Sequence, residues 1–290
     1  MDTQSVSVVI PSYNRLHYLR ECLTALRPQP EVLEVVVVDD CSTDGTRAYL
    51  EALGSEWPAV RRLGNDAQSG SVRSRNRGIA AARGRYIMVL DDDMVVTADF
   101  LARLLEHKRA TGADVMSAPV IWLTSSDSRE TALDLLVRRP AGPSINRKRC
   151  EIEGGVAGCD DLELPLLPAV MLADAETFRA LQYDERLAGN AWREETDWQL
   201  RASAAGKKLV LCSHAACVHL PPAGGGQRSM RRLRYELSVL RNNAYFLRKH
   251  WRWLRESSSF DVRGHWIPAT LSYSCGRTFA AVSRRLAGAQ

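Results

Sequence analysis

The amino-acid sequence predicts an α/β protein with a mostly parallel, open sheet flanked by helices. The first observation is that short apolar runs rich in valine and isoleucine alternate with segments of helical periodicity between residues 6 and 111. The second is that polar loops follow three of these runs, and the loop at 91–93 consists of aspartates alone. Such alternation is typical of a parallel sheet with helices on both faces. Ligands of these sheets bind beyond the carboxyl ends of the strands, so the three loops form the candidate site.

The first strand–helix unit lies near the N-terminus. Its strand is the apolar run VSVVI at 6–10, which we expect Pro11 to end. Leucines then recur at helical spacing over 16–26, and Asn14 is the predicted N-cap of this helix. The loop between the two elements is therefore the first candidate for ligand binding.

The second and third units repeat this pattern. A fully apolar strand at 35–38 is followed by a polar loop and a helix at 46–53, which Gly54 is expected to end. The third unit comprises a helix, a strand and a further helix, at 72–82, 86–90 and about 98–111.

The rest of the sequence is less regular. Residues 124–165 are polar and interrupted by proline and glycine, which predicts loops or an insertion near the candidate site. A strand at 169–173 then leads into a helix that Asp174 is expected to cap. One more helix and two strands follow, at about 195–205, 208–212 and 216–220.

Composition places the chain among globular proteins, since 45% of its residues are hydrophobic and 25% are charged. No apolar stretch approaches the roughly 20 residues of a membrane-spanning helix. The N-terminal sequence MDTQSVSVVIPSYN lacks the basic region and cleavage site of a secretory signal, so we expect a cytoplasmic protein. The seven cysteines include no C-x-x-C pair, which favours free buried thiols over a structural zinc or redox site.

Positive charge is concentrated in 228–256, where nine Arg or Lys face two Glu, a net +7 in a chain of +5. One or two amphipathic helices are predicted there, because apolar residues recur at steps of four and three: Leu233, Leu237, Leu240, Ala244 and Leu247. The arginines, Trp251 and Trp253 suit an anionic membrane surface, so we predict peripheral contact with the inner membrane face. In the alternative, this stripe of apolar residues, the leucine stripe, packs onto the rest of the protein. The two interpretations are compatible if the stripe packs inward and the basic face meets the membrane. Nucleic-acid binding is disfavoured, because no recognition module accompanies the charge.

Two acidic loops follow predicted strands. Like-charge repulsion among the aspartates at 91–93 would be relieved by a divalent cation. Mg²⁺ and Mn²⁺ take oxygen ligands and share them with substrate phosphates. The alternative is a capping or solvated acidic loop. In the second loop, VVVVDDCSTDGT at 35–46, carboxylates can accept hydrogen bonds from a base or a ribose, while Asp44 is better suited to cap the next helix.

Together these segments resemble the family 2 glycosyltransferases, which have the GT-A fold. The resemblance covers roughly residues 5–220. It depends on five strings in the family's order: VSVVIPSYNR at 6–15, VVVVDDCSTDGT at 35–46, SRNRGIAAARGRYIMVLDDD at 74–93, YDERL at 183–187 and EETDWQLRASAAGKKL at 194–209. It implies a Rossmann-like nucleotide-binding half and an acceptor half, followed by a helical C-terminal extension.

The resemblance implies a set of residues that bind the nucleotide sugar. Pro11, Tyr13 and Arg15 match the loop that holds the nucleobase and diphosphate, and Asp40 matches the aspartate that reads the base. Arg75 matches a position on the helix that borders the donor site, with a surface salt bridge as the alternative.

The resemblance also implies a divalent cation, Mn²⁺ or Mg²⁺. Asp91 and Asp93 match the two ends of the family's D-x-D motif, which contacts the ribose and coordinates the metal. Asp92 is expected among the donor-binding residues, and which of the three aspartates binds metal directly stays open. His219 is expected to complete the metal shell, with a structural histidine as the alternative.

The catalytic residues are implied by the motif EETDWQLR at 194–201, which aligns with the family's E-D-x-D-L-x-x-R. Glu195 replaces the usual aspartate and is the expected general base; Glu194 remains possible. Asp197 either orients the acceptor or pairs with Arg201 one helical turn later.

The resemblance implies an inverting hexosyltransferase that uses a UDP- or dTDP-linked sugar. Residues 1–225 would form the GT-A domain, with about 1–118 for the nucleotide sugar and about 119–225 for the acceptor and catalysis. Residues 226–290 would form the basic extension. A glycan, a lipid-linked glycan or a small molecule would be the acceptor, bound in part by 119–170.

Two other functions are disfavoured. A sugar nucleotidyltransferase should open with a glycine-rich loop, whereas the first loop here reads PSYNR. A non-catalytic nucleotide-sugar-binding or scaffold protein would not need the acidic residues and His219, which are all present.

Overall fold

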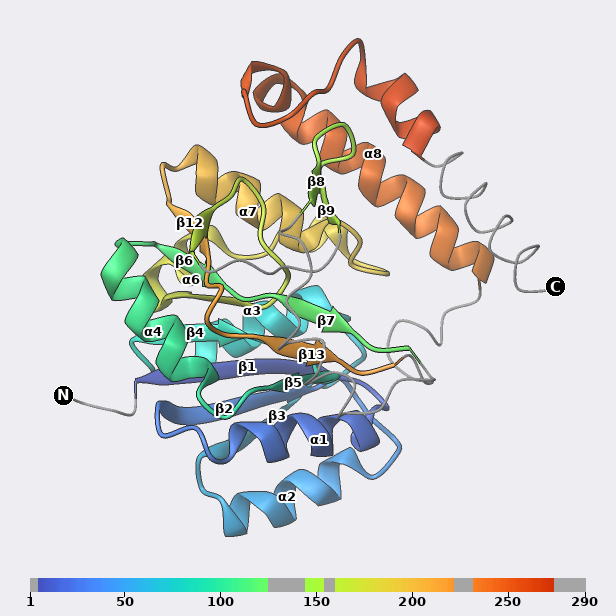
Figure 1. The fold of residues 1–290 in the computed structure, drawn as a ribbon. Coiled ribbons are helices and arrows are strands. Elements are labelled where there is room, and N and C mark those ends of the chain that lie inside the picture. The colour runs from blue at the N-terminus through green and yellow to red at the C-terminus, as the bar shows by residue number, and fades with distance from the viewer. Residues whose placement is uncertain (1–4, 125–143, 154–159, 222–231, 274–290) are drawn as a thin grey trace, which may run out of the picture.

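The computed structural model describes residues 5–124, 144–153, 160–221 and 232–273 (Figure 1). A mixed, mostly parallel sheet of eight strands forms its centre, in the order β10-β12-β6-β11-β4-β1-β2-β3. The half formed by the first units is parallel and comprises β1 Val6–Ser12, β2 Val32–Asp39, β3 Val60–Gly64 and β4 Tyr86–Val89. The other half mixes both directions and comprises β6 Val115–Ser117, β10 Leu162–Glu163, β11 Met171–Asp174 and β12 Leu209–Leu211.

Helices cover both faces of this sheet, as predicted. The side chains of β1 alternate: Val8 and Ile10 pack into one core cluster, and Val9 packs into the other. The first cluster is completed by α1 Leu16–Leu26, α2 Thr46–Glu56 and α4 Phe100–Thr111. The second is completed by α3 Ser71–Ala81, α6 Ala175–Leu181 and α7 Glu194–Ala204.

Helix α3 lies very close to the sheet because of one glycine. A Cβ atom at Gly78 would overlap Cγ1 of Val9 and would lie 3.1 Å from Cγ2 of Val38. The absence of a side chain therefore sets the distance between α3 and β1 and so positions Arg75, one turn earlier on the same helix.

Smaller elements lie at the carboxyl ends of the central strands. A three-stranded sheet comprises β5 Met94–Val96, β7 Val120–Trp122 and β13 Cys217–His219. The polar region predicted as irregular contains an antiparallel pair in its described part, β8 Ser144–Asn146 and β9 Glu151–Glu153, while 125–143 and 154–159 lie outside the described residues. A 3-10 turn, η1 Glu185–Leu187, precedes α7.

Several predicted boundaries are wrong. Strand β1 continues through Pro11 to Ser12, because β4 pairs only with the first four residues of β1, and the proline lies beyond that pairing. Helix α2 continues past Gly54 to Glu56. The predicted strand at 35–38 begins three residues earlier, at Val32.

The predicted helix caps are also corrected. Asn14 does not cap α1; instead its Oδ1 accepts the N–H of Thr43 at 2.7 Å. The start of α1 is capped by Asp44 across the loop, whose Oδ2 accepts the N–H of Leu16 at 2.8 Å. The other carboxylate oxygen of Asp44 accepts bonds from Thr46 at the start of α2, although the N-cap residue of that helix is Gly45, one position after the predicted Asp44. Asp174 makes no side-chain cap of α6.

The C-terminal extension is mainly helical where it is described, and it packs onto the rest of the protein. It contains α8 Arg232–Glu256 and a helix that begins at residue 266. Leu254 and Phe260 share a core cluster with Leu200 of α7, and Figure 1 shows α8 running past α7 and the β8–β9 pair. No helix in the described part of the chain has both the length and the apolar character needed to cross a bilayer.

The predicted leucine stripe of α8 is only partly buried. Leu247 is buried, but Leu233 and Leu237 are 73% and 57% exposed. The buried face instead follows a neighbouring line of residues that includes polar groups: Val239, Asn242, Asn243, Phe246, Leu247, His250, Trp251 and Leu254. Periodicity alone missed this face because the burial of the asparagines depends on partners outside the helix. Residues 226–231 and 274–290 of the predicted extension lie outside the described residues.

Candidate active site

A cavity of about 980 Å³ opens beyond the carboxyl ends of β1, β2 and β4. All but one of the predicted site residues line it: Pro11, Tyr13, Arg15, Asp40, Arg75, Asp91, Asp92, Asp93, Glu194, Glu195 and His219. The exception is Asp197. Parallel strands deliver their following loops to one edge of the sheet, which explains why loops distant in sequence converge here.

The aspartate loop after β4 is buried against Arg15. The Arg15 guanidinium lies 2.5 Å from Oδ2 of Asp93 and 3.3 Å from Oδ1 of Asp92. The Ser12 hydroxyl donates to Oδ2 of Asp92 at 2.7 Å. Burial raises the pKa of Asp92 to about 7, and the charges of Asp93 and Asp91 add to this, while Arg15 and the Ser12 hydrogen bond oppose it. Arg15 therefore does not fully compensate the negative charge of the three aspartates.

Asp93 of this loop, together with His219 at the end of β13, best fits a metal ion. Oδ1 of Asp93 is buried without a hydrogen-bond partner, and Oδ2 lies 3.3 Å from Nε2 of His219. Nδ1 of His219 lies 2.7 Å from the carbonyl oxygen of Leu220, to which it donates a hydrogen bond, so Nε2 is the nitrogen that faces Asp93 and that a cation would bind. Asp91 is held differently, since its Oδ1 lies 2.5 Å from Arg75. Asp93 and His219 therefore offer one carboxylate and one imidazole to a divalent cation, but the ligand atoms of the predicted set Asp91, Asp93 and His219 do not all lie within 4.8 Å of one another.

Arg75 is the centre of a buried ion network and not a surface salt bridge. Its side chain is 5% exposed and pairs with Asp91, with Glu194 and, at 3.3 Å, with Oε1 of Glu195. Glu194, which pairs with Arg75 through Oε1, is itself almost fully buried. Burial raises the pKa of Glu195 above its ordinary value; Arg75 opposes this and Asp91 adds to it. Glu195, with 26% of its side chain exposed, is thus the more accessible of the two glutamates.

Asp40 organises the loop before α3. Its carboxylate accepts the backbone N–H groups of Ser69 and Gly70 at 2.7 and 2.8 Å, and Oδ1 also accepts the side-chain amide of Asn65 at 2.6 Å. Asp40 therefore fixes the floor of the cavity next to Pro11 and Tyr13.

Asp197 lies behind the cavity, between α7 and α8. Its fully buried carboxylate pairs with Arg201 at 2.8 Å, Lys249 at 2.6 Å and His250 at 2.7 Å. Burial raises the pKa of Asp197, but the hydrogen bond from His250 and the charges of Arg201 and Lys249 outweigh it, and the pKa lies below its ordinary value. This geometry matches the alternative in which Asp197 pairs with Arg201, and it adds Lys249 and His250 of α8 as partners.

The sequence did not single out Arg193, which sets the position of Glu194. Its backbone is left-handed, with φ of 77°, and its side chain is buried. The guanidinium donates to Oδ1 of Asn243 at 2.9 Å and to the carbonyls of Cys150 and Arg149, each at 2.8 Å. The first turn of α7 is therefore tied to α8 and to the loop before β9. Nothing local in the sequence could indicate these partners.

Trp122 is a second lining residue that the sequence did not indicate. Its side chain is 66% exposed at the end of β7, and its ring stacks on His219 with centroids 3.9 Å apart and 23° between the planes. The ring therefore covers His219 and presents an aromatic surface to the cavity.

Comparison with known proteins assigns the family. The family model for glycosyl transferase family 2 matches residues 7–159, more than half of the chain and including every loop from β1 to the aspartate cluster. The chain belongs to glycosyltransferase family 2. This family 2 chain is 42% identical over 111 residues to the succinoglycan biosynthesis protein ExoO of Rhizobium meliloti, covering 38% of this chain and 31% of ExoO. It is 35% identical over 149 residues to WcaA of Escherichia coli, a putative colanic acid biosynthesis glycosyl transferase. This match covers 50% of this chain and 53% of WcaA.

Solved structures confirm the GT-A fold of this family 2 chain. GalNAc-T7, crystallised with UDP, GalNAc and Mn²⁺, superposes with a TM-score of 0.67 at 17% identity, over 87% of this chain and 49% of GalNAc-T7. Residues 1–349 of S. aureus TarS, in complex with UDP-GlcNAc, superpose with a TM-score of 0.60 at 17% identity. This superposition covers 87% of this chain and 74% of the TarS chain. The chain spans about a third to a half of the length of the two curated relatives.

Proposed function

We propose that this protein transfers a sugar from a nucleoside diphosphate sugar to an acceptor hydroxyl with inversion at the anomeric carbon. The observation that carries the proposal is that one cavity holds the aspartate loop, Arg15 and Arg75 paired with it, and the accessible Glu195. Family membership supports glycosyl transfer, and the UDP and UDP-GlcNAc named in the related structures support a UDP-linked donor, with dTDP as the alternative base.

The proposed chemistry assigns Glu195 as the general base. The acceptor oxygen attacks the anomeric carbon, the bond from that carbon to the diphosphate oxygen breaks, and Glu195 takes the proton of the acceptor hydroxyl. Glu194 is unsuited to this role because Arg75 holds one of its oxygens and the rest of the side chain is buried. Arg75 keeps Glu195 close to the aspartate loop and so aligns the base with the donor.

We propose that Asp93 and His219, with Asp91, hold a divalent cation, Mn²⁺ or Mg²⁺. The unpartnered buried oxygen of Asp93 supports this, as does the Mn²⁺ named in the GalNAc-T7 structure. When bound, the ion would supply a Lewis acid that neutralises charge on the departing diphosphate.

The acceptor is proposed to be a sugar hydroxyl of a glycan or lipid-linked glycan. Trp122 supports this class, because an exposed aromatic ring at the cavity can stack on the apolar face of a sugar. The exposed Leu233 and Leu237 of α8, with Ile267 and Leu271 on the following helix, support contact between the extension and an anionic membrane that carries such an acceptor. Vesicle sedimentation at low and high salt tests this contact, and equal recovery with neutral and anionic vesicles would reject it.

The donor assignment is tested by measuring release of UDP or dTDP from a panel of nucleotide sugars with Mn²⁺ or Mg²⁺ present. We expect release from at least one donor, loss of release with a chelator, and loss of release in Asp93→Asn while circular dichroism shows that this variant is still folded. Calorimetry with UDP alone supplies a readout that needs no acceptor. The proposal is wrong if no nucleotide binds and no donor is cleaved, and its metal component is wrong if chelation changes nothing.

A further inference from the structure

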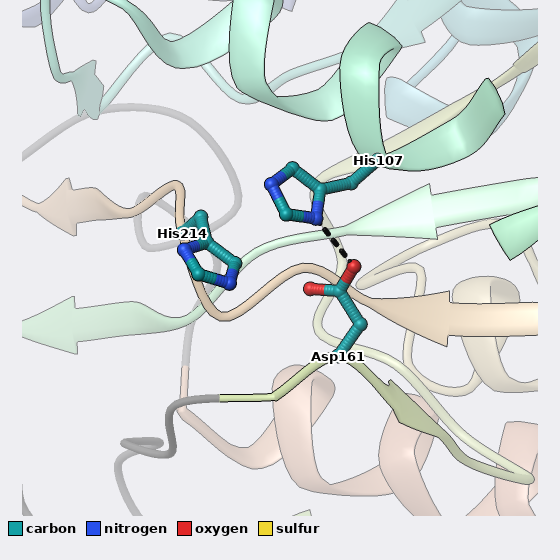
Figure 2. A group of neighbouring side chains, drawn as sticks. All are labelled: His107, Asp161 and His214. Carbon is teal, nitrogen blue, oxygen red and sulfur yellow. Dashed lines mark hydrogen bonds and ion pairs between the residues drawn. The ribbon is translucent and has the colours of Figure 1, made fainter. Parts of the chain in front are cut away.

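A second group of metal-ligating side chains lies outside the cavity. His107, Asp161 and His214 converge with their ligand atoms all within 4.8 Å of one another (Figure 2). They are the only three His, Cys, Asp or Glu residues to do so among those the structure describes. Nδ1 of His107 lies 2.6 Å from Oδ2 of Asp161, and the two imidazole rings are stacked with centroids 4.3 Å apart. None of the three lines the donor cavity.

Three segments of the chain, distant in sequence, bring these side chains together. His107 belongs to α4, Asp161 directly precedes β10, and His214 lies in the turn between β12 and β13. Asp161 is already oriented, since its Oδ1 accepts the backbone N–H of Ser213 at 3.1 Å while Oδ2 faces His107. Hydrogen bonds of this kind fix the direction of a ligating carboxylate.

We propose that His107, Asp161 and His214 bind a divalent transition metal of the zinc type. Two imidazoles and one carboxylate form a nitrogen–oxygen set that suits Zn²⁺, and His214 is exposed, so water can fill a fourth position. Bonds of roughly 2.1 Å in a tetrahedral site place ligand atoms about 3.4 Å apart. To reach this value the 2.6 Å contact between His107 and Asp161 must open by less than about 1 Å, and one imidazole must turn out of the stack so that both ring nitrogens face the ion.

An ion at this site would join α4 to the connection between β12 and β13. His214 on this connection lies five residues before His219, the cavity histidine that ends β13. The role of the ion is to hold that connection in place. The inference does not depend on the proposed transferase activity, because neither the ligands nor the tests involve a nucleotide sugar.

The test uses the full chain without a histidine tag and in an Asp93→Asn background, which removes the proposed cation site of the cavity. Equilibrium dialysis should find one Zn²⁺ per chain. His107→Gln and His214→Gln should each weaken binding at least 10-fold, whereas His265→Gln, at an exposed histidine outside the group, should have no effect. Co²⁺ should give the intense visible bands of a tetrahedral site, and these should be lost in the same two variants.

Thermal unfolding supplies a second measurement. Zn²⁺ at 100 times its dissociation constant should raise the melting temperature by about 5 °C or more, because it binds only the folded state. This rise should disappear in His214→Gln, whose exposed side chain makes loss of folding an unlikely confounder. Absence of bound zinc, or zinc binding that His107→Gln and His214→Gln leave unchanged, would show a plain His107–Asp161 ion pair and overturn the proposal.

Discussion

The buried carboxylate of Asp197 offers a direct test of how the C-terminal extension stabilises the catalytic part. In Asp197→Asn the side chain keeps its shape but loses the charge that Arg201, Lys249 and His250 share. Removing one partner of a buried ion pair generally costs about 3–5 kcal/mol. Arg201 and Lys249 remain about a quarter exposed and can turn towards water, so this figure is discounted. We expect a loss of about 2–3 kcal/mol in the free energy of unfolding.

Urea-induced unfolding, followed by circular dichroism, measures this loss. For a chain of 290 residues the midpoint should fall by roughly 1 M. The matched control is Arg252→Gln, which breaks an exposed pair between Arg252 and Glu256 on the same helix and should cost less than about 0.5 kcal/mol. Because Asp197 lies outside the cavity, the kcat/KM of the folded variant should stay within about threefold of the unsubstituted protein.

Two outcomes would refute this reasoning. A loss of stability below about 1 kcal/mol would mean that the network is not a source of interhelical stability. A fall of about 100-fold or more in the activity of fully folded Asp197→Asn would restore the alternative in which Asp197 orients the acceptor.

Three further predictions concern the base and the packing of α3. Glu195→Gln should lower kcat by about 10²- to 10⁴-fold with little change in UDP affinity, whereas Glu194→Gln should mainly lower stability; the reverse result would move the base by one position. Burial raises the pKa of Glu195, and only its carboxylate form accepts a proton. As the pH is lowered, kcat should therefore begin to fall at a pH above the ordinary glutamate pKa of about 4.3. A fall in kcat that begins only at or below this pH would contradict the prediction. Gly78→Ala should destabilise the protein by about 1–3 kcal/mol in urea titrations, because its new methyl group would overlap Val9 of β1; unchanged stability would show that α3 can move away.

The local pattern of apolar residues was sufficient to assign the strands and helices that form the parallel half of the sheet. Valine-rich strands flanked by leucine-periodic helices bury both faces of the sheet, so strand and helix assignments for β1, α1, β2 and β4 were right apart from their ends. The three-residue strands β5, β6 and β7 were missed, because so short a run carries no clear periodicity, although β12 and β13, which are equally short, were predicted. β3 was missed because two arginines, Arg61 and Arg62, interrupt its apolar pattern.

The family, the α/β class and the residues that gather at the cavity were determined by the sequence itself. Residue type at fixed spacing is enough to recognise the loops, and the carboxyl ends of parallel strands lie at one edge of the sheet. Tertiary structure alone decided how the charges are shared. Arg75 binds Glu194 across 119 residues of sequence, and the buried face of α8 contains His250 because Asp197 lies opposite it. Such pairings depend on the relative placement of elements distant in sequence, which helical or strand periodicity does not encode.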